Sequence, residues 1–463
     1  MRYIFVSMMA LSSFLLSAEE SATWQSDVIG VEYAHLAPAH WLNKLKTPHK
    51  VLMQPSEIIE FNQQLIANNS HVVEPLNSPK QLSQKALLKK IESISKVPSS
   101  ARYFVDGKKL SSDDFDQYIV NLNKNAVKPV NDIQFAMVVS RTVMRTFPTY
   151  DRVFNQQMDT DLDRFQETGV FPGDTLAVLH ESADKEWYLA QHYHYLAWIP
   201  KEAVAIGNRE DILAYREAKS FVVVTGSKVT TNYVPNQPSV SQVQLDMGTR
   251  LPLVPHTKMV NQIYGQNPYA SYVVSLPVRG DDGSLTFSNA LIARHHDMHE
   301  GYLPMTSENI IAQGFKFLGE RYGWGHDYDA RDCTGFIGEI YKTFGVLMPR
   351  NSGQQGAGKY AINNRFTKDQ SSASKMPVVN QMQVGDLIYI PGHVMMYIGE
   401  DGGQPYVIHD VKGLGYKDAQ GQFYRGTLNG VSVTPLLPLQ LSANSSYLDR
   451  VYNIKRVRLN PAN

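Results

Sequence analysis

The chain has 463 residues, and its hydrophobic fraction of 43% is enough for several packed cores. A chain of this length is typical of about three domains. Lysine and arginine together number 44, as do aspartate and glutamate, so the formal net charge is zero. This balance excludes the strongly basic surface that attracts nucleic acid, and we expect no nucleic-acid partner.

The first 18 residues have the pattern of a secretory signal peptide. Arg2 supplies the positive end, residues 3–16 supply the apolar segment, and Ser17-Ala18 supply the small residues before a cleavage site. The apolar run is too short for a transmembrane span, and no cysteine follows it for lipid attachment. We therefore expect an exported, soluble protein that is periplasmic or secreted. The alternative is a buried N-terminal strand or helix.

Residues 19–127 are predicted to form a helical N-terminal cap region. Pro55 begins one amphipathic helix and Pro79 begins another, and the connections between helices are rich in turn-forming residues. The polar composition of this region predicts that it wraps around other domains and forms no large core of its own. We identify no catalytic or ligand-binding motif in it.

Short β-type segments follow. Apolar and β-branched runs alternate with turn signals at a spacing of roughly 8–12 residues, which is typical of small antiparallel β structures. We predict two small barrels, at residues 128–210 and 211–300, of which the second is a weaker copy of the first.

A histidine cluster lies between the second predicted barrel and the last domain. His295 and His299 are four residues apart and would share a metal ion if this segment were helical. Gly301 and Pro304 break any helix directly afterwards, which favours a polar linker. We therefore predict no metal site and no cofactor.

The only cysteine, Cys333, begins an amphipathic helix in the last predicted domain, residues 301–463. Asp332 is a good N-cap and Gly345 is a good terminating residue. Exported proteins usually pair their cysteines, so a lone cysteine is either a small buried hydrophobe or a reactive thiol. The free N–H groups at a helix start favour a thiolate.

Two histidines on predicted strands offer a base for this thiol. His393 opens the strand 393–398, and His409 lies near the end of the strand 406–410. A hairpin centred near Asp401 places the two histidines directly opposite each other. The alternative is that both are polar strand-end residues. A thiol, an imidazole base and a third group that orients the base favour acyl transfer, and the imidazole would give a thiolate at neutral pH.

The motifs of the last domain form an ordered set. They are Tyr322-Gly323-Trp324-Gly325, Asp332-Cys333-Thr334-Gly335-Phe336, Pro349-Arg350-Asn351-Ser352, Gly385-Asp386-Leu387, Gly392-His393-Val394 and Val407-Ile408-His409. This set resembles the NlpC-type cell-wall peptidases, which are papain-like cysteine enzymes that cut bacterial peptidoglycan. The segment from Asp161 to Ile199 is similar to the first SH3-like barrel of family members with two barrels, and the N-terminal region resembles their cap. The implied fold is α+β: a papain-like domain, with the cysteine helix packed on an antiparallel sheet, preceded by two small SH3-like β-barrels and a helical cap.

By this resemblance Cys333 is the nucleophile, His393 the base and His409 the orienting residue. In two-barrel relatives the first barrel helps to recognise a free N-terminal L-alanine. The amine of this alanine would contact the aspartate that precedes the nucleophile, and also an acidic residue and a tyrosine from the barrel. The positions in this chain with implied substrate contacts are Asp332, Thr334, Trp324, Asn351, Ser352, Asp174 and Tyr195.

Three positions depart from the family pattern. Thr334 stands where a serine is commoner, His326 where a second glycine is usual, and Asn351 where an aspartate is common. The last change removes a negative charge near the proposed amine site and bears on substrate preference.

The resemblance implies hydrolysis of the amide bond between γ-D-glutamate and a diamino acid in peptidoglycan stem peptides or muropeptides. A second possibility is another acyl transfer by the same three residues, as a different cell-wall amidase or a transferase. A third is a non-catalytic wall-binding protein with a relict thiol. The sequence leaves open whether the diamino acid is lysine or diaminopimelate, whether intact wall or released fragments are cut, and the oligomeric state.

Overall fold

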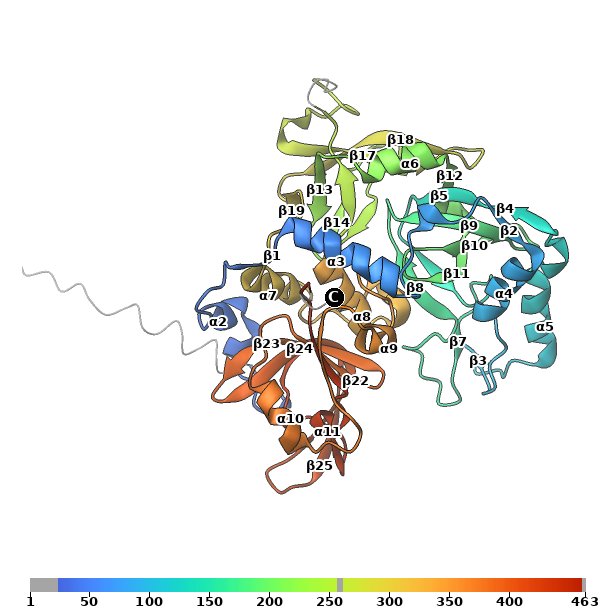
Figure 1. Cartoon of the computed structure of the whole chain (residues 1–463). Helices are drawn as coiled ribbons and strands as arrows, with labels where there is room; N and C mark the ends of the chain where they lie inside the picture. Colours follow the sequence, from blue (N-terminus) through green and yellow to red (C-terminus); the bar gives the residue numbers. More distant parts are fainter. Residues whose placement is uncertain (1–23, 256–260, 460–463) are drawn as a thin grey trace, which may run out of the picture.

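The sheets of the protein fall into two β-rich units and one α+β unit, with an N-terminal segment packed across them (Figure 1). The computed structural model describes residues 24–255 and 261–459. The predicted signal peptide at residues 1–18 lies outside the described residues. Within the described part of the chain, no helix is long and apolar enough to cross a membrane.

The N-terminal segment pairs and packs with the other units. Its longer helices are α3 (Pro55–Asn68), α4 (Gln84–Ile94) and α5 (Ser112–Asn121), preceded by α2 (Pro38–Leu42). Its short strands pair with strands from elsewhere: β1 (Val51–Met53) with β20 (Met305–Thr306), β2 (Gln81–Ser83) with β4 (Val130–Asp132), and β3 (Tyr103–Phe104) with β7 (Val153–Phe154). The apolar face of α3 joins the core of the C-terminal unit. The segment therefore wraps around other units, as its composition predicted.

The first β unit, residues 134–207, is a seven-stranded antiparallel sheet in the order β12-β5-β9-β10-β11-β6-β8. Its strands are β5 (Gln134–Val138), β6 (Thr142–Arg145), β8 (Gln166–Val170), β9 (Thr175–Glu181), β10 (Trp187–Gln191), β11 (Leu196–Pro200) and β12 (Val204–Gly207). One face of the sheet encloses an apolar core, and α4 and α5 cover the other face. Burial of both faces explains why these strands are almost continuously apolar.

The second β unit, residues 221–300, follows α6 (Arg209–Arg216) and gathers several small sheets around one apolar core. Its pairings join β13 (Phe221–Val224) to β16 (Arg250–Pro252) and β19 (Met298–Glu300), β14 (Lys228–Thr230) to β15 (Gln244–Asp246), and β17 (Ser271–Arg279) to β18 (Leu285–Ala293). His295 lies in the turn after β18, whereas His299 lies on β19. Neither the helical metal pair nor the polar linker is therefore correct, because β19 belongs to the sheet of this unit.

The C-terminal unit packs α7 (Ser307–Phe315) and α8 (Cys333–Lys342) against a six-stranded antiparallel sheet in the order β21-β28-β22-β23-β24-β25. The strands are β21 (Ile362–Arg365), β22 (Leu387–Ile390), β23 (His393–Asp401), β24 (Gln404–Lys417), β25 (Phe423–Pro435) and β28 (Asn453–Arg456). Phe336, Ile337 and Ile340 on α8 pack with Met396 and Ile408 on the sheet. The predicted α+β class, with a cysteine-bearing helix on an antiparallel sheet, is confirmed.

The register of the β23–β24 hairpin differs from the prediction by two residues. Met396 pairs with Ile408, and a bulge follows between Tyr397 and Gly399. The turn consists of Gly402 and Gly403, whose φ angles of +55° and +78° suit a tight two-residue hairpin turn. The turn is therefore centred beyond Asp401. As a result, His393 and His409 are diagonal neighbours, which is still within reach of long side chains.

Candidate active site

Cys333 occupies the first turn of α8. The Asp332 carboxylate caps this helix by accepting hydrogen bonds from the backbone N–H groups of Thr334 and Gly335, at 3.2 and 2.9 Å. Cys333 is 7% exposed, and its thiol lies beside the backbone N–H of Val394 on β23. The cap thus presents the thiol to the strand that begins with His393.

The structure brings His393 and His409 together. His393 Nε2 lies 2.9 Å from His409 Nδ1. His409 Nε2 in turn lies 3.0 Å from the Thr434 hydroxyl on β25. A neutral His393 that donates its Nε2 proton to His409 has a lone pair on Nδ1, which is the state required to accept a thiol proton.

Burial favours the uncharged forms of both the thiol and the imidazole. It raises the pKa of the Cys333 thiol to about 12, and the negative charge of Asp332 acts in the same direction. It also lowers the pKa of His393 to about 4. The expectation of a preformed thiolate therefore differs from the structure, since desolvation outweighs the helix start and the Val394 N–H. A neutral imidazole is still able to take the thiol proton during attack.

Asp410, which follows His409 on β24, is a buried carboxyl group that the sequence analysis did not identify. It is 1% exposed, and in the described residues neither of its oxygens has a hydrogen-bond partner. Burial, reinforced by Asp332, raises its pKa well above the ordinary value. When ionised, Asp410 acts on the Cys333 thiol in the same direction as Asp332 and raises its pKa.

The Asp332 carboxylate is saturated with donors. Arg350 donates to both of its oxygens, at 3.1 and 2.6 Å, and the backbone N–H of Gly325 donates at 3.1 Å. Although burial opposes ionisation, the Arg350 guanidinium holds the pKa of Asp332 well below its usual range. An amine ligand of Asp332 would have to compete with this guanidinium. This role of Arg350 was not predictable, because the Pro349-Arg350 motif does not reveal the partner of the guanidinium.

On the first β unit, Tyr195 pairs with Glu167 and not with Asp174. The Tyr195 hydroxyl donates to Glu167, whose other oxygen accepts from the Thr146 hydroxyl at 2.5 Å. Tyr195 also interacts with the side chain of Asn351. Glu167 was missed because the sequence does not show which face of β8 it occupies.

Asp174 lies in a different environment from Tyr195. Its carboxylate is 3.5 Å from Lys342 on α8 and 3.5 Å from His192, and it accepts the Phe171 N–H at 2.9 Å. These contacts place Asp174 beside the C-terminal end of α8, whereas Cys333 is at the N-terminal end.

The other predicted substrate contacts lie in segments that adjoin Cys333 or β8. Trp324 begins the segment η9 (Trp324–Asp329), most of which has non-helical backbone angles, and its indole N–H donates to the backbone carbonyl of Gln166 at 3.1 Å. Asn351 caps α9 (Ser352–Ala357), of which Ser352 is the first residue. The Thr334 hydroxyl donates to Asp332 at 3.0 Å and accepts from Arg350 at 2.6 Å.

In the described part of the chain, one group of side chains has the spacing of a metal site: His35, His40 and Asp401 lie with ligand atoms within 4.8 Å of one another. His35 Nδ1 accepts the Glu32 N–H at 2.9 Å, so a neutral His35 carries its proton on Nε2. It donates that proton to Asp401 at 2.8 Å, and Lys44 also pairs with this carboxylate. A metal would need the Nε2 lone pair, so the group is an ion-pair cluster that ties the N-terminal segment to the hairpin.

Two family models match parts of the chain: an SH3 domain of the SH3b1 type at residues 148–200, and the NlpC/P60 family at residues 319–433. The chain is 26% identical over 215 residues to a γ-D-glutamyl-L-lysine dipeptidyl-peptidase of Bacillus cereus, covering 44% of this chain and 54% of that protein. It is 32% identical over 103 residues to a protein of the same name from Bacillus subtilis, covering 20% of this chain and 30% of that protein. The matches therefore span about half or less of these relatives.

A solved NlpC/P60 endopeptidase from Photobacterium damselae subsp. piscicida superposes with a TM-score of 0.73 at 17% identity. The superposition covers 92% of this chain and 97% of that one. The arrangement of all the units is therefore a shared fold.

Proposed function

We propose that the protein is a cysteine peptidase of the cell wall, because residues 319–433 form an NlpC/P60 domain and residues 148–200 form an SH3 domain. Its substrate bond is the amide between γ-D-glutamate and a diamino acid in peptidoglycan stem peptides. The proposal rests above all on the 2.9 Å contact between His393 and His409. His393 directly precedes Val394, whose backbone N–H adjoins the Cys333 thiol. It includes export, for which residues 1–18 would be the signal.

In the proposed reaction the Cys333 sulfur attacks the carbonyl carbon of the scissile amide while His393 takes the thiol proton. His409 holds the His393 ring through the Nε2–Nδ1 contact, and His393 then delivers the proton to the leaving amine. Water hydrolyses the resulting thioester and restores the thiol. Since the N–H groups of Thr334 and Gly335 are bound to Asp332, the backbone N–H of Cys333 is the helix-start donor for the oxyanion.

The subsite for the substrate amine is proposed at Glu167 and Tyr195. These side chains are hydrogen-bonded to each other, and Tyr195 also reaches Asn351, directly after Arg350. A partly buried carboxyl group of this kind discriminates well, because an ammonium group bound beside it compensates its charge. Glu167 replaces Asp174 as the acidic member of this subsite.

The test is to incubate the purified protein, and its Cys333→Ala variant, with L-Ala-γ-D-Glu-diaminopimelate and with the corresponding lysine tripeptide. Release of L-Ala-γ-D-Glu by the wild type alone supports the proposal, and the preferred tripeptide identifies the diamino acid. A different product points to another amidase or a transferase. Binding to isolated wall without cleavage, unchanged in Cys333→Ala, would overturn the proposal.

A further inference from the structure

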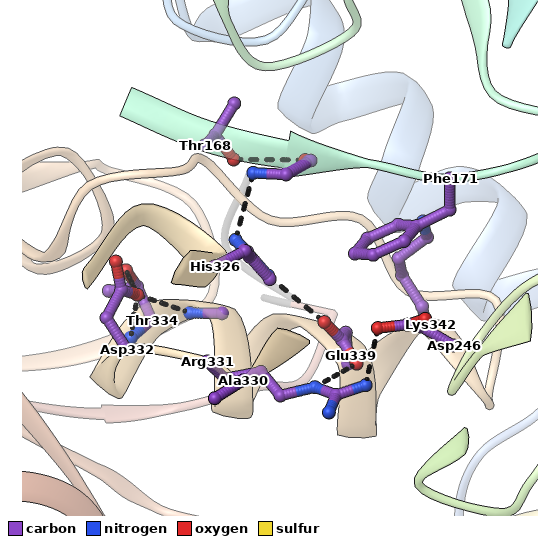
Figure 2. A network of polar contacts seen from close by, with 12 residues as sticks. Thr168, Phe171, Asp246, His326, Ala330, Arg331, Asp332, Thr334, Glu339 and Lys342 are labelled. Carbon is purple, nitrogen blue, oxygen red and sulfur yellow. Dashed lines mark hydrogen bonds and ion pairs between the residues drawn. The ribbon is translucent and has the colours of Figure 1, made fainter. Parts of the chain in front are cut away.

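The start of α8 is tied to the second β unit by a buried arginine (Figure 2). Arg331, which directly precedes the cap residue Asp332, is 0% exposed. Its guanidinium donates at 2.8 Å to Glu339 on α8, to Glu320 and to Asp246, the last residue of β15. Asp246 is also 0% exposed, so this contact is shielded from solvent.

The same contacts continue from α8 to the first β unit. Glu339 lies 3.0 Å from His326 Nε2, and His326 Nδ1 accepts the Gly169 N–H of β8 at 3.2 Å. Because Nδ1 is an acceptor, the neutral ring has its proton on Nε2 and donates it to Glu339. Burial lowers the pKa of His326, which keeps the ring in this neutral form. Figure 2 shows His326, Glu339, Arg331 and Asp246 joined in a row.

The His326 ring also sets the distance between β8 and the first turn of α8. A Cβ atom added to Gly169 would lie 2.7 Å from His326 Cβ, and one added to Gly335 would lie 2.7 Å from His326 Nε2. Gly335 is only two residues after Cys333. His326 itself has a φ of +68°, a conformation that persists where the surroundings determine it strongly.

We propose that Asp246 of the second β unit is a positioning residue for the Cys333 thiol, acting through Arg331, with His326 as its counterpart towards the first β unit. The inference rests on the assignment of Cys333 as the nucleophile. Arg331 and Gly335 flank the thiol in the chain, so the row of contacts holds the helix start from both sides. Without the Asp246 charge, Arg331 keeps Glu339 and Glu320 and still donates to the Ser227 carbonyl at 2.8 Å, but it loses its ion pair with the second β unit. A displacement of about 1 Å at a reacting atom is enough to lower a rate by up to about 100-fold.

Since Cys333 is the only cysteine, alkylation of the full-length protein by iodoacetamide measures its reactivity independently of any peptide substrate. The test compares Asp246→Asn with a matched control, Asp386→Asn. Asp386 is 2% exposed and pairs with Arg456 at 2.9 and 2.8 Å, outside the row of contacts. Both substitutions remove the charge of a buried aspartate that pairs with an arginine; Asp246 also accepts from Arg141 Nε at 3.2 Å.

We expect Asp246→Asn to lower the alkylation rate, and kcat for L-Ala-γ-D-Glu-diaminopimelate, by about 10-fold, with KM changed less than about 2-fold. Asp386→Asn is expected to lower Tm without this loss of reactivity. An unchanged alkylation rate in Asp246→Asn, or an equal fall in both variants, would overturn the inference. If alkylation falls as expected but the wild type cleaves no stem peptide, the proposed function fails while the positioning role stands.

A second variant covers the case in which Asp246→Asn does not fold. His326→Gly removes the ring, and glycine adopts the φ of +68° at no steric cost. We expect the same loss of alkylation rate with a native far-UV circular dichroism spectrum. A folded His326→Gly protein with wild-type thiol reactivity would contradict the proposal.

Discussion

His393 Nε2 and His409 Nδ1 lie 2.9 Å apart across the β23–β24 hairpin, and His409 is held in turn by the Thr434 hydroxyl at 3.0 Å. The row of proton donors and acceptors therefore runs from His393 through His409 to Thr434. In the proposed mechanism this row of contacts keeps the His393 lone pair on Nδ1. Each of its residues can be substituted separately.

Replacing His409 tests whether its role is to accept a proton from His393. His409→Ala removes the acceptor and is expected to lower kcat by about 100-fold, the scale of positioned acid–base catalysis. His409→Asn keeps an oxygen acceptor near the place of Nδ1, so we expect it to retain more activity than the alanine variant. Steady-state kinetics on the tripeptide make the comparison. Equal losses in the two variants would show that acceptance at this position does not matter.

The protonation states predict how the reactivity of Cys333 depends on pH. With the pKa of the thiol raised to about 12 and that of His393 lowered to about 4, the pair is neutral between these values. Above pH 4 the imidazole is free to accept a proton, and below it the ring is protonated, so kcat/KM should fall with falling pH only near pH 4. Iodoacetamide alkylation should rise with pH without a plateau at neutrality. A plateau of alkylation from about pH 6 to 8 would instead indicate a thiolate–imidazolium pair.

The parts of the site that local sequence determines were predictable. The start of α8 follows from the Asp332 cap and the apolar spacing after Cys333, and both are present in the structure. The meeting of His393 and His409 follows from two strands joined by a glycine turn. The register was missed by two residues because the bulge between Tyr397 and Gly399 and the centre of the turn depend on the whole sheet.

Partners that come from distant segments were not predictable. Arg350 binds Asp332, which lies 18 positions away in the sequence, and Asp246 binds Arg331, which lies 85 positions away. Neither contact leaves a periodic or capping signal in the sequence. The contact of Tyr195 with Glu167 was not predictable either, because the pleat of β8, which decides the side facing Tyr195, depends on its pairing with β6.

The Arg350–Asp332 pair provides a test of stability at the helix start. Arg350→Gln leaves a buried carboxylate without its cation, and we expect a loss of about 3–5 kcal/mol in the free energy of unfolding. Asp332→Asn combined with Arg350→Gln removes both charges, and asparagine is as good an N-cap as aspartate. Urea unfolding should therefore show the double variant to be more stable than Arg350→Gln. If the two losses simply add, the pair does not interact in the folded protein.

The amine subsite is tested by comparing two acidic residues of the first β unit. Glu167→Gln removes the charge beside Tyr195, and we expect KM for the free-amine tripeptide to rise by about 10-fold or more, since the loss of one charged contact is worth more than about 1.4 kcal/mol. The matched control is Asp174→Asn, which lies beside Lys342 and His192 and should leave this KM within about 2-fold of the wild type. An N-acetylated tripeptide, which has no ammonium group, should be a poor substrate for the wild type and should lose nothing further in Glu167→Gln. A rise in KM with Asp174→Asn but not with Glu167→Gln would move the subsite back to Asp174.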